Sequence, residues 1–171
     1  MERKLKFLSK SKIQGCSFLI LVMTGTHNQG FDRLIKAADE LSKQSKEQVF
    51  VQTGNSKITP KNCEWKKFLT PEELEKKIKE SSIVITHAGA GSIINCLKNK
   101  RKTIVVPREK KFNEHINDHQ IDLASALEKE KKVVMCRNMK KLGEKINKAK
   151  TLITAKQNNK ELIKEIELFL G

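Results

Sequence analysis

A short β-branched run that leads at once into a glycine-rich turn constrains the fold of this chain most. Residues 83–85 read Ile-Val-Ile, and residues 87–92 read His-Ala-Gly-Ala-Gly-Ser. Glycines let the backbone turn sharply and bring N–H groups close to a ligand. Residues 93–97 then carry apolar side chains at helical spacing, so Gly91 and Ser92 lie where a helix begins and attracts anions. The pattern is half of a nucleotide-binding βαβ unit.

Such a turn is weak evidence by itself, because many α/β proteins use one only to reverse the chain. The next apolar run, residues 103–106, ends at Pro107-Arg108, and residues 114–120 then bring many hydrogen-bonding side chains together. Ligands bind beyond the carboxyl ends of strands in open parallel sheets. These neighbours therefore favour a ligand site over simple chain reversal.

Strand and helix patterns alternate along the chain, and each strand precedes a helical stretch. The clearest helix start is Thr70, an N-cap residue with Pro71 in the first turn and Glu73 at the capping-box position. The alternation predicts an α/β protein, a single Rossmann-like doubly wound parallel sheet with right-handed crossovers. The predicted strands are residues 18–23, 49–51, 65–69, 83–86, 103–106 and 133–135.

The length of 171 residues suits one domain, which we expect to cover residues 1–171. Residues 1–16 form a basic N-terminal extension, and residues 157–170 are predicted to form an amphipathic C-terminal helix. The apolar face of that helix either covers the domain's own core or docks on a partner. The apolar run at residues 16–23 is far shorter than the roughly 20 residues of a membrane span and has no convincing cleavage site, so we expect a cytosolic location.

The charge of the chain favours acidic partners, because 35 Lys and Arg against 20 Asp and Glu give a net charge of +15. Nucleotide diphosphates, nucleic acid and anionic lipid surfaces all fit this charge. Few aromatic residues lie between the lysines for base stacking, which argues against nucleic acid. The four cysteines form no CxxC pair, so neither a zinc site nor a disulfide framework is indicated.

Two loops could face one crevice, because Gly25 and Thr26 follow the first strand as Gly89 follows the fourth. The alternative for Gly25 is an ordinary βα turn that binds no ligand. His27 either binds a phosphate or caps its own loop, and His87 is either a phosphate donor or a structural histidine. We expect the neighbouring Asp32 and Arg33 to pair across a helix surface.

The strongest polar cluster holds Glu114, His115, Asp118, His119 and Gln120. Asp118 is also a plausible N-cap of the next helix, which would place His119 and Gln120 in its first turn. His115 and His119 are four residues apart, as metal ligands on a helix can be, but no HExxH pattern exists. We predict no metal site and no cofactor.

Four motifs together, GTHNQGFDRL, THAGAGS, VVPR and EHINDHQ, resemble the C-terminal domain of glycosyltransferase family 28 over residues 19–134. The likeness is greatest to the small cytosolic subunits of bipartite glycosyltransferases, both eukaryotic lipid-linked N-acetylglucosamine transferases and bacterial exopolysaccharide enzymes. The resemblance implies the C-terminal, donor-binding half of a GT-B glycosyltransferase. It also implies a UDP-sugar donor, a membrane-anchored acceptor-binding subunit, a lipid-diphosphate-linked acceptor and peripheral attachment at the cytosolic membrane face through that subunit.

The resemblance further implies a set of donor-binding residues and no catalytic base on this chain. Sugar hydroxyls would contact His119 and Gln120. Asn95 departs from the family, whose members commonly carry an acidic residue there that accepts from the ribose hydroxyls. The full set is Gly25, Thr26, His27, His87, Gly89, Ala90, Gly91, Ser92, Asn95, Arg108, Glu114, Asp118, His119 and Gln120.

A second hypothesis is a non-catalytic nucleotide-binding or regulatory module of the same fold. The shortness of the chain and the substitution at Asn95 favour it slightly. Both hypotheses place the ligand in the same crevice, and they differ in whether a sugar is transferred.

Overall fold

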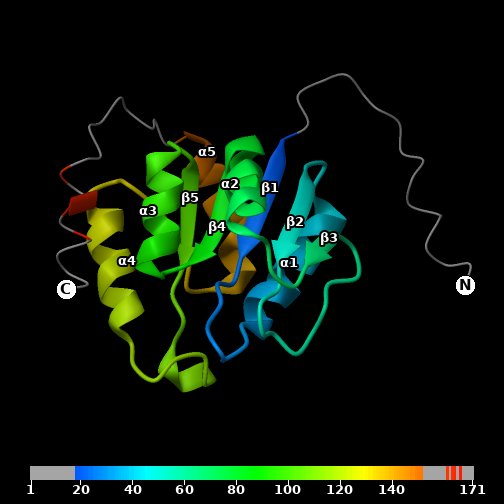
Figure 1. Cartoon of the computed structure of the whole chain (residues 1–171), viewed down its shortest axis with the longest axis horizontal. Helices are drawn as coiled ribbons and strands as arrows, with labels where there is room; N and C mark the ends of the chain where they lie inside the picture. The colour runs from blue at the N-terminus through cyan, green and yellow to red at the C-terminus, as the bar shows by residue number, and fades with distance from the viewer. Residues whose placement is uncertain (1–17, 152–160, 162, 165, 167–171) are drawn as a thin grey trace, which may run out of the picture.

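The computed structural model describes residues 18–151, 161, 163, 164 and 166, whose strands form one parallel sheet in the order β3-β2-β1-β4-β5-β6 (Figure 1). The strands are β1 (Leu19–Met23), β2 (Gln48–Gln52), β3 (Glu64–Lys66), β4 (Ser81–His87), β5 (Lys102–Val106) and β6 (Val134–Met135). The helices are α1 (Asp32–Gln44), α2 (Pro71–Glu80), α3 (Ala90–Lys98), α4 (His119–Lys129) and α5 (Leu142–Thr151), and the 3₁₀ turns are η1 (Lys110–Phe112) and η2 (Met139–Lys141). The predicted α/β class and Rossmann-like sheet are confirmed.

Helices cover both faces of the sheet, with α1 and α5 behind it and α2, α3 and α4 in front in Figure 1. The alternation of side chains along each strand produces these two layers. In β1, Ile20 and Val22 pack in the cluster that includes α1 and α5, whereas Leu21 and Met23 pack in the cluster that includes α2. Strands buried on both faces explain why these segments read as continuous apolar runs.

The winding of the chain reverses at β1, which pairs with β2 on one side and β4 on the other. All strand pairs are parallel, so every strand ends at the same edge of the sheet. In Figure 1 that edge lies at the lower end of the sheet. Open sheets of this kind bind ligands outside the strand ends at the reversal point, here between β1 and β4.

The element boundaries agree with the sequence patterns except at the third strand. We expected residues 65–69, but β3 spans Glu64–Lys66 and is exposed throughout. Its ladder to β2 covers only residues 50–52, and the chain then turns toward the start of α2. That start is confirmed, because Thr70 and Glu73 form a complete capping box and Pro71 is the first helical residue.

The ends of the chain are described only in part. The N-terminal extension, residues 1–16, and most of the predicted C-terminal helix lie outside the described residues. Within that helix, Ile166 is buried among residues of α3 and α4, and Ile163 packs against the same cluster. These two side chains therefore cover the domain's own core. Among the described residues, no helix is both long and apolar enough to cross a membrane.

Candidate functional site

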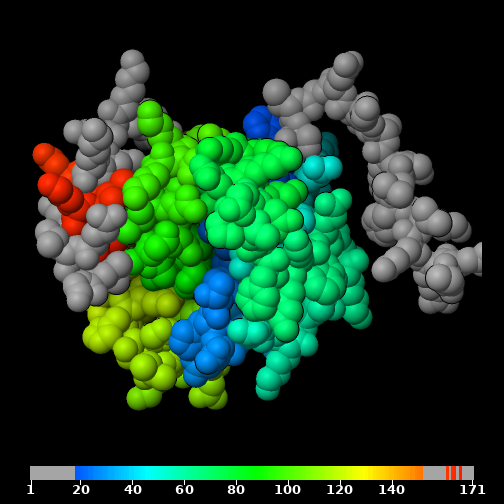
Figure 2. Space-filling model, in the orientation of Figure 1, coloured from blue at the N-terminus to red at the C-terminus, as the bar shows by residue number. Residues whose placement is uncertain are grey.

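Three loops meet beyond the carboxyl ends of β1, β4 and β5. They comprise residues 24–31, residues 88–89 and residues 107–118. Because β4 lies between β1 and β5, its short loop is flanked by the other two. Figure 2 shows the segment after β1, in blue, lying between the yellow-green segment after β5 and the blue-green segments that follow β2. The residues that the sequence patterns singled out thus come together at one edge.

The imidazole of His87 lies against both glycine turns. A Cβ atom added to Gly25 would lie 2.5 Å from Cε1 of His87, and one added to Gly89 would lie 2.1 Å from Nε2. Gly25 also has φ of +80°, a conformation that favours glycine. The missing side chains at these two positions therefore make room for a ring of the protein itself.

His87 is neutral at physiological pH. Burial is the main cause that lowers its pKa to about 4, and the charges of Arg108, His27 and His115 lower it further. A hydrogen bond with the Met23 backbone acts in the opposite direction. The ring is half-buried and its Nδ1 lies 3.4 Å from the Thr86 hydroxyl. These contacts favour a structural role for His87 over the role of a phosphate donor.

At the N-terminus of α3, the space beside Gly91 is open, whereas the space beside Gly25 and Gly89 is filled by His87. Gly89 is its N-cap and makes no side-chain capping bond. Gly91 is exposed, and a Cβ atom there would meet nothing within 4 Å. The first N–H groups of a helix lack partners within it and carry its positive dipole. A phosphate group fits such a terminus, and glycine at this position allows its closest approach.

Arg108 fastens the loop after β1 to the loop after β5. Arg108 is 1% exposed, and its Nη2 donates to the Thr24 carbonyl at 2.8 Å. Nη1 donates to the carbonyls of Gln29, Gly30 and Glu114. The charged group also lies 4.7 Å from the centre of the Phe31 ring, whereas its Nε has no hydrogen-bond partner among the described residues. Most donors of the predicted ligand residue Arg108 are thus used within the protein.

Glu114 belongs to an ion-pair network below Arg108. One carboxylate oxygen accepts from Nε of Arg33 at 2.7 Å, and the other accepts from the backbone N–H of Glu109. Arg137 lies 2.8 Å from the buried carboxylate of Glu109. The pKa of Glu109 is lowered to about 2, mainly because of the hydrogen bond from Arg137. The expected surface pair of Arg33 with Asp32 is wrong, because Asp32 instead accepts from the backbone N–H of Lys57.

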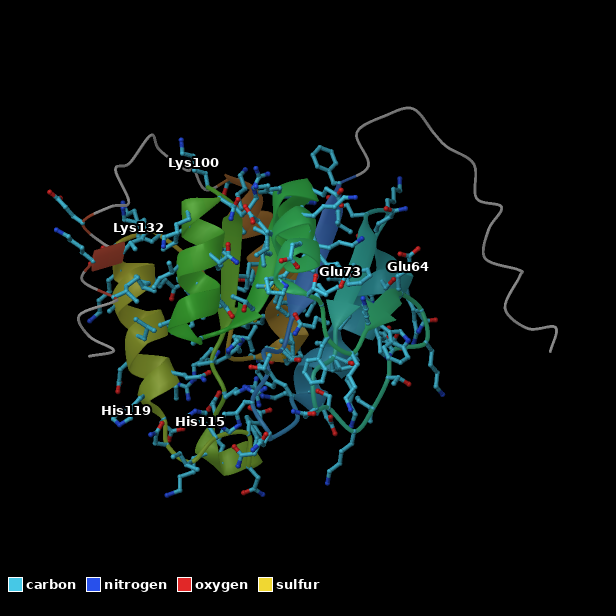
Figure 3. The ribbon with its side chains drawn as sticks, in the orientation of Figure 1. Glu64, Glu73, Lys100, His115, His119 and Lys132 are labelled. Atoms are coloured by element: carbon cyan, nitrogen blue, oxygen red, sulfur yellow. The ribbon has the colours of Figure 1, made fainter. Side chains whose placement is uncertain are left out.

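His27 and His115 stand next to each other at this edge, with ring centres 5.1 Å apart. Nδ1 of His27 accepts from the backbone N–H of Gln29, which is the loop-capping role left open by the sequence. Burial lowers the pKa of His27, and the charges of Arg108 and His115 lower it further. Both rings therefore lie together at the carboxyl edge of the sheet. Figure 3 places His115 on the loop after β5.

The three predicted ligand residues at the start of α4 make different contacts: they are Asp118, His119 and Gln120. Asp118 is the N-cap, as predicted, but makes no capping bond and instead accepts from the backbone N–H of Lys110 at 2.9 Å. His119 is exposed, and its Nδ1 lies 3.8 Å from a carboxylate oxygen of Asp122. Gln120 accepts from the backbone N–H of Arg108 at 3.0 Å, so its carbonyl oxygen is used within the protein.

Asn95, the departure from the family pattern, is half-buried one helical turn beyond Ser92. Its side-chain oxygen accepts from Nδ2 of Asn99 at 2.9 Å. The side-chain oxygen of Asn95 is therefore used by the C-cap residue of α3. This contact leaves the Asn95 amide nitrogen, a donor, as the group able to reach a ligand.

Possible metal ligands and thiols are the other reactive groups among the described residues. Within residues 18–151 and the four described positions beyond, no group of three His, Cys, Asp or Glu side chains could hold a metal ion. Cys63, Cys96 and Cys136 are free thiols, and burial raises the pKa of the first two to about 12. These thiols are accordingly protonated and poor nucleophiles.

The sequence patterns missed a third turn, which follows β2. Gly54 has φ of +56°, and a Cβ atom there would lie 2.6 Å from the Gly25 carbonyl oxygen. The hydroxyl of Thr24 donates to the carbonyl of Gln52 at 3.0 Å, which ties the ends of β1 and β2 together. The run Thr-Gly-Asn-Ser at residues 53–56 was the available signal, because such residues mark turns.

Comparison with known proteins agrees with this arrangement. The profile of the glycosyltransferase family 28 C-terminal domain matches residues 19–168. The UDP-N-acetylglucosamine transferase subunit ALG13 of Homo sapiens is 30% identical over 128 residues, which are 68% of this chain and 11% of that protein. The Mus musculus protein of the same name is 31% identical over 93 residues, 52% of this chain and 8% of that protein. The chain thus spans about a tenth of the length of these relatives.

Solved glycosyltransferase structures share the fold. The kitacinnamycin glycotransferase superposes with a TM-score of 0.64 at 14% identity and covers 94% of this chain and 42% of its own. MurG of Acinetobacter baumannii superposes with a TM-score of 0.56 at 17% identity, covering 86% of this chain and 49% of its own. In both, about half of the solved chain matches. With the profile match over most of its length, the chain belongs to the glycosyltransferase family 28 C-terminal domain family.

Proposed function

We propose that this chain is the UDP-sugar-binding part of a glycosyltransferase whose acceptor-binding part is a separate, membrane-anchored subunit. The observation that carries the proposal is the uncapped N-terminus of α3, with the open position at Gly91, at the reversal point of a glycosyltransferase-family sheet. The name of the human and mouse relatives, a UDP-N-acetylglucosamine transferase subunit, supports both the donor class and the subunit role.

The diphosphate would bind at the first turn of α3, where N–H groups and the helix dipole stabilise the charge that develops on leaving UDP. The Gly25 to His27 turn would lie beside it, held in place by Arg108 and His87. In this proposal Arg108, His87 and Glu114 position the loops. Gln120 would offer its amide N–H groups to the sugar, because its carbonyl oxygen already accepts from Arg108.

In the transfer step, an acceptor hydroxyl oxygen would attack the anomeric carbon of the sugar as the bond from that carbon to UDP breaks. The hydroxyl proton would pass to a base on the partner subunit. We propose a hexose or N-acetylhexosamine as the sugar and a lipid-diphosphate-linked sugar as the acceptor. The chain would work at the cytosolic face of a membrane through that partner.

Calorimetry with UDP tests the site by means of two matched glycines. Gly91 and Gly143 are each the second residue of a helix, and a Cβ atom at either would meet nothing within 4 Å. We expect Gly91→Ala to weaken UDP binding by about fivefold or more, because the methyl group holds a phosphate off the helix terminus. Gly143→Ala should leave UDP binding unchanged.

Equal affinities of both variants for UDP would place the diphosphate elsewhere. Binding that EDTA abolishes would show that a metal ion carries the diphosphate, contrary to the proposal. Gln120→Ala adds a second comparison, since it should weaken a UDP-sugar by about fivefold and leave UDP nearly unaffected.

The alternative of a non-catalytic module rests on Asn95, whose oxygen is occupied by Asn99. If it is right, the chain binds UDP and transfers no sugar with any membrane subunit. Co-expression with a candidate membrane-anchored acceptor-binding subunit, followed by a panel of radiolabelled UDP-sugars on membranes, separates the two functions.

A further inference from the structure

The loop after β5 exposes two large apolar side chains. Phe112 is 49% exposed and Ile116 is 72% exposed, two of the five exposed large apolar residues in the described part of the chain. Phe112 ends η1, and this loop reaches the lower end of the molecule in Figure 1. One face of the Phe112 ring lies 4.9 Å from the Arg33 guanidinium, which fixes the direction of the ring. Ile116 has no comparable support.

Exposed lysines lie on the turn that carries Phe112 and on a second turn that is tied to it. The turn η1 carries Lys110 and Lys111, the turn η2 carries Lys140 and Lys141, and all four are exposed. Arg137, just before η2, pairs at 2.8 Å with Glu109, just before η1, and so ties the two turns together. We call Lys110, Lys111, Phe112, Ile116, Lys140 and Lys141 the basic loop surface.

Acidic groups offset only one of these four lysines, because Lys111 lies 2.8 Å from a carboxylate oxygen of Glu109. Glu109 and Glu114 are buried, and their carboxylates are taken up by Arg33, Arg137 and Lys111. Exposed Asp118 is bound to the backbone of Lys110. The basic loop surface therefore presents apolar tips within a net positive rim.

We propose that the basic loop surface binds directly to a bilayer containing anionic lipids, with Phe112 and Ile116 entering the headgroup region. Lysine attracted to acidic headgroups, beside a few inserted apolar residues, is the chemistry of interfacial membrane binding. A protein partner fits less well, because lysine is depleted in the cores of protein interfaces and two apolar tips make a small core. This contact does not depend on what binds in the crevice.

The basic loop surface lies beside the proposed donor site, so a lipid contact there would also orient the site toward the membrane. The loop that carries Phe112 also supplies Glu114 and His115, next to the turn after β1. Binding to lipid through this loop would hold the open edge of the sheet at the membrane surface. A substrate embedded in the bilayer would then meet the crevice without leaving the membrane.

Vesicle sedimentation of the full chain tests the charge. We expect binding to phosphatidylcholine vesicles with roughly a third phosphatidylserine, and little to phosphatidylcholine alone. Lys140→Glu with Lys141→Glu should weaken it about tenfold or more. Lys100→Glu with Lys129→Glu changes the net charge equally at the ends of α3 and α4, away from the surface, and should weaken it less than about threefold (Figure 3 labels Lys100).

Fluorescence tests insertion, because Trp65 is the only tryptophan. In a Trp65→Phe background, Ile116→Trp should shift its emission to the blue on anionic vesicles, and Ile116→Ser should weaken sedimentation about tenfold. Ile116 is largely exposed, so neither change disturbs the core. No blue shift, equal losses in the two lysine pairs, or binding that needs an added membrane subunit would each overturn the proposal.

Discussion

At the scale of single residues, glycines in the same kind of loop serve different purposes. Gly25 and Gly89 lack side chains because His87 occupies the space, whereas Gly91 borders open space. The sequence motifs alone place all three in glycine turns that could bind phosphate. The structure separates the residue that leaves room for a ligand from those that leave room for the protein.

This difference predicts opposite effects on stability. Gly25→Ala should lower the free energy of unfolding by about 2 kcal/mol or more, because φ is +80° and the new methyl would meet His87. Gly91→Ala should raise it by up to about 1 kcal/mol, because alanine is the better helix former. Urea denaturation of both variants measures the two values. A stable Gly25→Ala protein would mean that the turn relaxes away from His87.

Arg108 is the residue on which the loop after β1 depends most. Arg108→Lys should lower the free energy of unfolding by about 3 kcal/mol, because one ammonium cannot serve four carbonyls, two of them in buried contacts. Arg101→Lys is the control, since Arg101 also donates to carbonyls but is half-buried and remote from the site; it should cost less than about 1.5 kcal/mol. Hydrogen exchange should accelerate at residues 24–30 only in the Arg108 variant.

At the scale of elements, local patterns were sufficient wherever a strand or helix is determined by its own residues. The capping box at Thr70 and the buried strands β1, β4 and β5 are of this kind. The short edge strand β3 was placed wrongly, because its position depends on pairing with β2 rather than on apolar alternation.

The site was predictable only in outline for the same reason. The sequence predicted which loops meet, because parallel strands end at one edge. It could not show that Arg33 would pair with Glu114, or Arg137 with Glu109, since these partners lie 81 and 28 residues apart. Nor could it show that Arg108 and Gln120 are used largely within the protein.

The predicted C-terminal helix, residues 157–170, should contribute to the stability of the fold. Ile166 is 4% exposed among residues of α3 and α4, so Ile166→Ala should lower the free energy of unfolding by about 2–4 kcal/mol. Ile116→Ala, at a side chain that is 72% exposed, is the matched control and should cost less than about 0.5 kcal/mol. Equal values would show that the segment does not support the core, and its apolar face would then be free for a partner.

At the scale of the whole molecule, the ligand edge is also where buried ionisable groups are concentrated. Arg108, Glu109 and Glu114 are buried beyond the end of β5, and the half-buried His87 is the last residue of β4. Packing helices on both faces of the sheet leaves that edge as the place where polar groups gather. The stability of the fold and the state of the crevice should therefore depend on pH together.

The direction of that dependence follows from two lowered pKa values. His87 titrates near 4 in the folded chain against an ordinary 6.5, so its contribution is present above 6.5 and is lost as the pH falls toward 4; His27 is shifted in the same direction. Glu109 titrates near 2 against 4.5, so its contribution is lost between 4.5 and 2. Each window, taken over its full width, should remove about 3 kcal/mol from the free energy of unfolding.

Urea denaturation from pH 8 to pH 3 should accordingly show stability falling in two successive windows as the pH is lowered. His87→Gln should flatten the upper window and leave the lower one, because glutamine does not titrate. Glu109→Gln should do the reverse, since Arg137 and Lys111 then lose a charge that only the folded state pairs with them. If the upper slope survives in His87→Gln, the proton is taken up by another group, and the packing of this ring against the two glycine turns does not govern the acid response.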